Sequence, residues 1–221
     1  MSYIWNPFFA AALSIYATVA TLPATAADAQ QTVVLVHGAF VDGSSWSKVI
    51  PLLQAKGLRV IAVQNPLTSL ADDVAATKRA IETVPGSVIL VGHSWGGMVI
   101  TEAGMDSKVK ALVYVAAFAL PVGQSINSAS AGSPPAPWAA SLKKDSGGYL
   151  WLSEQTLGKY FAQDVSRQEV AVIAATQIPT FSGVFDDRLL HAAYETKPSW
   201  FIVPKADGAI PPQIERRWRR T

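Results

Sequence analysis

A serine flanked by small residues is the part of this sequence best suited to covalent chemistry. Four apolar residues, Val88 to Val91, predict a buried strand, and the apolar run from Trp95 to Met105 predicts a helix. Between them lies Gly92-His93-Ser94-Trp95-Gly96, which fits the pattern G-x-S-x-G. In a sharp strand-to-helix turn this pattern holds the serine hydroxyl above the strand ends. It therefore predicts that Ser94 is a nucleophile; the alternative is a glycine-rich turn with an incidental serine.

A serine hydroxyl is a weak nucleophile and needs a base, a carboxylate that orients the base, and donors for the developing oxyanion. The backbone N–H of Trp95, directly after the serine, is one expected donor. The loop after an earlier strand supplies the other, at Ala39 or alternatively at Phe40. His37 immediately precedes this loop, so we expect it to shape the loop rather than to act as the base.

Apolar strands alternate with amphipathic helices through the first half of the chain, which predicts a parallel sheet of βαβ units. Ser69 and Asp72 resemble a capping box at the start of one helix. Ser44 or Ser45 is a candidate N-cap of another, which ends at Gly57 and turns apolar residues inward, Leu52 among them. Pro51 should kink that helix or mark its true start. The predicted strands are 32–36, 58–63, 88–91, 109–117 and 199–203; the predicted helices are 46–57, 70–84, 95–105 and 210–220.

Residues 121–196 interrupt this alternation. Residues 121–137 are rich in Ser, Ala, Gly and Pro and predict a loop, and several short helical patterns follow, among them a full capping box at Ser166-Arg-Gln-Glu169. Aromatic residues are frequent here. An insertion of this kind predicts a lid over the carboxyl edge of the sheet, whose aromatic side chains line an apolar pocket or hold the lid to the core.

The composition bounds the function. With 221 residues, half of them hydrophobic, the chain is long enough for one domain with a sizeable core. The net charge of +2 is too small to indicate a nucleic-acid partner, and four arginines crowd the last six residues. Residues 1–29 resemble a secretory signal with an A-x-A-like cleavage site but an uncharged n-region. We expect a secreted or periplasmic protein with a mature domain at 30–221, the alternative being an uncleaved membrane anchor.

Three motifs together resemble the α/β-hydrolase fold, and within it the small cofactor-free esterases related to plant methylesterases and hydroxynitrile lyases. They are Val36-His37-Gly38-Ala39-Phe40, Gly92-His93-Ser94-Trp95-Gly96-Gly97, and Lys197-Pro198-Ser199-Trp200 through Asp207 with Ile210-Pro211-Pro212. The resemblance runs from about Thr32 to Ile214. It implies a mostly parallel sheet with flanking helices and a helical lid, and it assigns the catalytic acid to Asp207. The alternative reading of Asp207 is an ordinary turn aspartate before Gly208.

The sequence departs from this family at the catalytic histidine. The family continues beyond the helix near residue 210 into one more strand, a loop that bears the histidine, and a closing helix, whereas this sequence ends at Thr221. Of its three histidines, we expect His93 to point away from Ser94, and His191 to lie in the lid on a helical pattern over residues 186–195. We therefore expect a C-terminally truncated chain, from a shifted reading frame or a premature stop, without a catalytic histidine and with impaired activity.

The sequence thus predicts a serine hydrolase of carboxylesterase type that acts on small esters. Ser94 and Asp207 are its catalytic residues, and Ala39 and Trp95 form its oxyanion hole. No cluster of His, Asp or Glu has metal-ligand spacing, and His93-Ser94 interrupts any dinucleotide-binding glycine pattern, so we expect neither metal nor cofactor. Two alternatives remain: a non-catalytic small-molecule binder, and a carbon–carbon lyase of the hydroxynitrile lyase type on the same scaffold.

Overall fold

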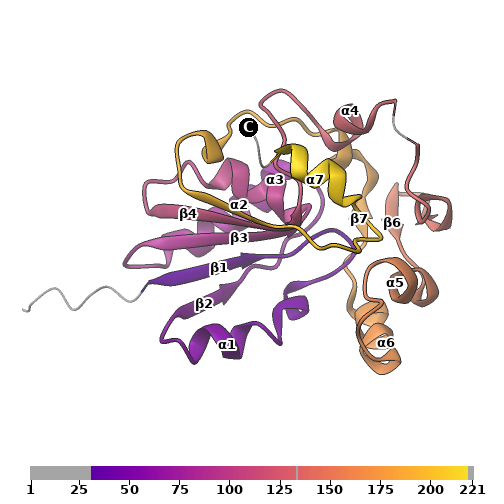
Figure 1. Cartoon of the computed structure of the whole chain (residues 1–221), viewed down its shortest axis with the longest axis horizontal. Helices are drawn as coiled ribbons and strands as arrows, with labels where there is room; N and C mark the ends of the chain where they lie inside the picture. The colour runs from indigo at the N-terminus through magenta and orange to yellow at the C-terminus, as the bar shows by residue number, and fades with distance from the viewer. Residues whose placement is uncertain (1–30, 133, 219–221) are drawn as a thin grey trace, which may run out of the picture.

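A parallel sheet forms the centre of the molecule. The structure is a computed structural model that describes residues 31–132 and 134–218, so the predicted signal segment 1–29 lies outside the described residues. The strands run in the order β2-β1-β3-β4-β8, and each neighbouring pair is parallel. This arrangement, with helices on both faces (Figure 1), confirms the predicted fold class. The bounds are β1 Thr32–Val36, β2 Arg59–Ala62, β3 Val88–Ser94, β4 Val109–Ala117 and β8 Ser199–Ile202.

Alternate residues of the strands face two separate apolar layers. Val34 and Val36 of β1 join the larger core with helices α2 (Leu70–Glu82) and α3 (Gly96–Ala103). Val33 and Leu35 face the 3-10 helix η1 (Gly43–Trp46) and helix α1 (Ile50–Gln54). Because both faces are covered, the strands read as continuous apolar runs rather than as alternating ones.

The segment between β1 and β2 differs from the prediction. The carboxylate of Asp42, rather than Ser44 or Ser45, caps η1 by accepting from the Ser44 N–H at 2.7 Å. Helix α1 begins at Ile50, so Pro51 lies in its first turn, where its missing N–H costs nothing, and marks the start of the helix, as one of the two predicted alternatives has it. Leu52, predicted to face inward, is exposed.

The lid elements α5, α6, β6 and β7 lie beyond the carboxyl ends of the strands, at the right in Figure 1, whereas Ala193 of η4 packs into the core with α3. The lid contains a small antiparallel sheet, β5-β6-β7, that was not predicted. The predicted helical pattern at 186–195 is wrong: two 3-10 turns flank a non-helical stretch that holds His191. The lid elements are α4 Ile126–Ser130, η2 Ala139–Ser141, β5 Lys143–Lys144, β6 Tyr149–Trp151, α5 Glu154–Tyr160, α6 Arg167–Thr176, β7 Thr180–Phe181, η3 Ser182–Asp186 and η4 Ala193–Glu195.

The last described element is helix α7 (Pro212–Trp218), the observed part of the helix predicted at 210–220. Its Trp218 ring lies 5.2 Å from the ring of Phe118, just beyond β4. None of the helices among residues 31–132 and 134–218 is both long and apolar enough to span a membrane.

Strand β8 has two different faces. Phe201 stacks on Tyr114 of β4 with ring centroids 4.7 Å apart, whereas Trp200 and Ile202 are 57% and 56% exposed. Among the described residues β8 pairs only with β4, so it is an edge strand with exposed apolar side chains. Such an edge is a template for pairing with another chain.

We expect the native chain to self-associate through β8, and Ile202→Lys to reduce this self-association without loss of stability. The side chain is exposed, so the change in unfolding free energy should stay within about 0.5 kcal/mol, while the charge opposes edge-to-edge pairing. Analytical ultracentrifugation and denaturant unfolding measure the two effects. Phe201→Lys is the matched control and should destabilise the fold by about 3 kcal/mol or more. Unchanged self-association in Ile202→Lys would contradict the prediction.

Candidate active site

Ser94 lies at a strained turn between the central strand and the helix that follows it. Strand β3 ends at Ser94, helix α3 begins at Gly96, and Ser94 has φ +51°, a left-handed conformation that a serine rarely adopts. The turn depends on missing side chains. A Cβ on Gly38 would lie 2.9 Å from the Cβ of Ser94, and one on Gly96 would lie 2.4 Å from the carbonyl oxygen of Val36. This close approach of two backbones is the geometry that the G-x-S-x-G pattern predicts.

Ser94 faces a cavity of about 380 Å³ that it shares with Ala39 and Asp207. The loop after β1, the end of β3 and the loop after β8 all contribute to it, which places the predicted site residues from three distant parts of the sequence around one space. Much of the remaining wall is apolar and comes from the lid, including Leu157, Tyr160, Phe161 and Ile173.

The loop after β1 distinguishes between the two candidate oxyanion donors. The N–H of Phe40 donates to the hydroxyl of Thr180 at 3.2 Å, and Phe40 is buried with φ +63°. That amide is therefore occupied, which leaves Ala39, a cavity residue, as the candidate on this loop. The other expected donor of the oxyanion hole is the backbone N–H of Trp95, which is the N-cap residue of α3.

The carboxylate of Asp207 is held by backbone N–H groups of the turn that follows it. Its Oδ1 accepts from the N–H groups of Ala209 at 2.7 Å and Ile210 at 2.8 Å. The lid holds the same turn: the Trp138 indole N–H donates to the Ala209 carbonyl at 3.1 Å, and the Gln163 amide reaches the Ala206 carbonyl at 3.4 Å. Asp207 therefore has the hydrogen bonds of a turn aspartate, and its second carboxylate oxygen takes no part in them, so its catalytic role stays a prediction.

His37 has a structural role, as expected. It is fully buried, its Nε2 accepts from the Asn65 N–H at 2.9 Å, and its Nδ1 lies 2.8 Å from the Gly38 carbonyl oxygen. These partners fix the neutral tautomer with the proton on Nδ1. Burial lowers its pKa, although the Gly38 carbonyl opposes the shift. His37 therefore shapes the Gly38–Ala39 loop and has no nitrogen left for Ser94.

The other two histidines have different surroundings. His93 is among the residues that line the Ser94 cavity, and its ring lies edge-on to the Trp46 ring, with centroids 6.4 Å apart. Burial lowers the pKa of His93 to about 4, and the nearby Asp207 carboxylate only partly opposes this shift. His191 borders a different hollow and is bound to Glu102, whose Oε2 lies 2.9 Å from its Nδ1.

Sequence analysis missed Asp73, which holds the residue after the nucleophile. Asp73 is fully buried; its Oδ2 accepts from the Trp95 indole N–H at 2.7 Å, and its Oδ1 accepts from the Leu67 N–H at 2.9 Å. Burial raises its pKa to about 6, although both hydrogen bonds favour the anion. The available signal was an acidic residue in the first turn of α2, which indicated only a favourable interaction with the helix dipole.

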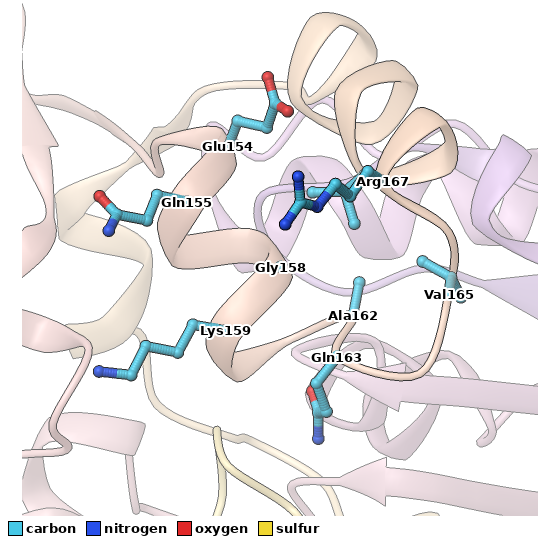
Figure 2. Close-up of a pocket in the computed structure, with 9 residues that line it drawn as sticks. Glu154, Gln155, Gly158, Lys159, Ala162, Gln163, Val165 and Arg167 are labelled. Carbon is cyan, nitrogen blue, oxygen red and sulfur yellow. The ribbon is translucent and has the colours of Figure 1, made fainter.

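A second hollow, of about 690 Å³, lies between α5 and α6 on the lid and does not include Ser94. In Figure 2 the Arg167 side chain extends from the start of α6 into the gap opposite Gly158 of α5. The short segment between these helices, residues 162–165, contributes to both hollows. Among the described residues, no group of three or more His, Cys, Asp or Glu side chains is placed to hold a metal ion.

Comparison with known proteins identifies the family of this chain. The profile described as "Alpha/beta hydrolase family" matches residues 33–221, most of the chain. The chain belongs to the alpha/beta hydrolase family. This membership confirms the predicted family and the prediction that the chain is a hydrolase.

The individual relatives include esterases and a lyase. Methylesterase 1 of Arabidopsis thaliana is 27% identical over 221 residues, covering 85% of this chain and 82% of the relative. Alpha-hydroxynitrile lyase of the same plant is 36% identical over 100 residues, which cover 38% of this chain and 39% of the lyase. The crystal structure of polyneuridine aldehyde esterase has a TM-score of 0.72 and 20% identity, covering 86% of each chain.

We expect the stability difference between the native chain and Asp73→Asn to grow as the pH falls. The folded pKa of Asp73, about 6, lies above its ordinary value of 3.8, so the folded state binds a proton first and gains stability as the pH falls through this range. Asparagine does not titrate. The difference should therefore increase by about 3 kcal/mol between pH 7 and pH 3.5, measured by urea unfolding.

Asp72→Asn is the matched control. Asp72 is exposed, and hydrogen bonds from Ser69 and Thr68 lower its pKa. Its stabilising contribution is therefore lost as the pH falls, and the difference between the native chain and this variant should shrink. The same pH trend in both variants would contradict the assignment of a raised pKa to Asp73.

Proposed function

We propose that this hydrolase is a serine esterase in which Ser94 attacks the carbonyl of a small ester. The observation that carries the proposal is the position of Ser94, in a left-handed turn at the end of β3 and facing the cavity that also contains Ala39 and Asp207. Backbone N–H groups of Ala39 and Trp95 bind the oxyanion of the tetrahedral intermediate, and Asp207 orients the base. The kinship with methylesterases supports an ester as the substrate.

The general base that should accept the Ser94 proton is poorly provided for. The ring nitrogens of His37 are bound to Asn65 and Gly38, and His191 is bound to Glu102. His93 is the histidine that lines the Ser94 cavity. With a pKa of about 4 it is neutral at pH 7 but a poor base, because an efficient general base has a pKa near the working pH. We therefore propose that the chain turns over slowly. Loss of the base of a serine triad costs about 10⁶-fold in turnover, on the order of 8 kcal/mol of barrier.

The cavity suits a small apolar acyl or alcohol group, since much of its lid wall is formed by Leu157, Tyr160, Phe161 and Ile173. A lyase reaction on the same scaffold is the second candidate function, because a hydroxynitrile lyase is among the relatives.

We further propose that residues 1–29 direct export and that the mature protein acts without a cofactor, a nucleic-acid partner or a membrane. The N-terminal sequence of the secreted protein tests the cleavage site.

A fluorophosphonate probe and p-nitrophenyl acetate together test the esterase proposal. We expect slow labelling at Ser94 and slow release of p-nitrophenol, both abolished in Ser94→Ala. Ser45→Ala is the matched control, because Ser45 lines the same cavity without lying at the turn, and it should keep both activities. Tight binding of small esters without labelling would favour the binder. Cleavage of a cyanohydrin that exceeds ester cleavage would favour the lyase.

Added imidazole tests whether the base limits the rate. A small imidazole can enter the cavity beside Ser94 and accept its proton, so we expect the Ser94-dependent rate at pH 7.5 to rise by about tenfold or more, since general bases contribute about 10²–10⁴. Ser94→Ala in the same buffer measures the cleavage that imidazole causes by itself. A Ser94-dependent rate that is fast without imidazole and unaffected by it would contradict the proposed impairment.

A further inference from the structure

A buried acid in α7 has no part in the reaction described above. Glu215 is 2% exposed, and its Oε1 has no hydrogen-bond partner among the described residues. A buried carboxylate with an unpartnered oxygen is costly as an anion, so such a group tends to take up a proton instead.

The surroundings of Glu215 favour its neutral form. Burial is the largest influence and the Asp207 carboxylate the second, and together they raise the pKa of Glu215 to about 8. The backbone N–H of Ala117 and the charge of Arg216 oppose this shift. The charged groups that act on Glu215 are thus Asp207 from the loop after β8 and Arg216 from its own helix, whereas β4 contributes only a backbone amide.

Glu215 connects α7 to the strand beside the nucleophile. Ala117, its hydrogen-bond partner, is the register partner of Ser94, and the next residue, Phe118, donates its N–H to the Ser94 carbonyl at 3.2 Å. Trp218 of α7 contacts the Phe118 ring. Helix α7 follows the Asp207 turn directly in the chain, so the position in which the helix packs limits where that turn can lie.

We propose that Glu215 is a positioning residue whose neutral side chain seats α7 against the end of β4 and thereby holds the Asp207 turn beside Ser94. The inference rests on the proposed function only for the role of Asp207. The docking of α7 itself can be measured without any catalytic activity. It assigns to α7 a docked state that binds a proton at Glu215 and an undocked state in which Glu215 is solvated and ionised.

Because the docked state of α7 binds a proton at Glu215, the docking equilibrium depends on pH. Glu215 has a pKa of about 8 when docked, against an ordinary value of 4.5, so docking is strongest at low pH and weakens as the pH rises between these values. The equilibrium constant for undocking should rise about fiftyfold from pH 6 to pH 8 and only about twofold more by pH 9.

Hydrogen exchange at two groups of amides tests the proposal, because exchange detects rarely populated open states. The N–H groups of Ala209 and Ile210 donate to Asp207 and report its turn, and the N–H of Ile214 donates to the Pro211 carbonyl and reports the start of α7. After correction for intrinsic exchange, the protection of all three should fall about fiftyfold between pH 6 and pH 8. The Val84 amide, which bonds to Ile81 at the end of α2, should show no such fall.

Two variants identify the titrating group. In Glu215→Gln the side chain is permanently neutral and similar in shape, so protection of the three amides should no longer depend on pH. Glu82→Gln removes an exposed glutamate on α2 and should behave as the native chain does.

Three results would overturn the proposal. The first is constant protection of the three amides in the native chain, which needs no variant to fold. The second is loss of protection at Ile214 without loss at Ala209 and Ile210, which would mean that Glu215 anchors the helix alone. The third is an unchanged pH dependence in Glu215→Gln. Since none of these measurements uses an ester, failure of the esterase assay leaves this test intact.

Discussion

The close approach of the chain around Ser94 is the constraint on which the rest of the site depends. Ser94 adopts its left-handed conformation only because Gly38 and Gly96 leave room for neighbouring backbone. Such a conformation is unfavourable for a serine and persists when the surrounding structure fixes it on every side. Here the parallel pairing of β3 with β1 and β4 fixes one side, and helix α3 fixes the other.

The lid and the core meet at the Asp207 turn. Trp138 and Gln163 of the lid bond to the backbone carbonyls of this turn, while α7 continues from its other end. A charged contact between Lys48, which lies between η1 and α1, and Glu169 of α6 adds a further link to the lid, and together with hydrogen bonds from Ser166 it lowers the pKa of Glu169 to about 2. The position of the Asp207 carboxylate is therefore set jointly by lid and sheet elements that are far apart in the sequence.

The central sheet was predictable because its strands are continuous apolar runs with turn residues between them. Strands β1 and β4 match their predicted bounds, and the positions of Ser94, Ala39 and Asp207 around one cavity follow from the order of the motifs. The lid was less predictable. Strands β5, β6 and β7 are two or three residues long, too short for alternation to distinguish them from loops.

Side-chain roles that depend on tertiary contacts could not be predicted from local patterns. Asp73 and Asp72 are neighbours in the first turn of α2, yet one is fully buried and the other is exposed, and only the fold distinguishes them.

The buried carboxylate of Asp73 also restricts how this protein can be redesigned. It accepts from the Trp95 indole and from Leu67, and the Leu67 carbonyl in turn accepts from the Phe181 N–H of β7 in the lid. The residue after the nucleophile, a bend in the core and the lid sheet thus form one chain of hydrogen bonds. Replacement of Trp95 to reshape the oxyanion side would leave Oδ2 of the buried Asp73 without its donor, so residues 95 and 73 have to be replaced together.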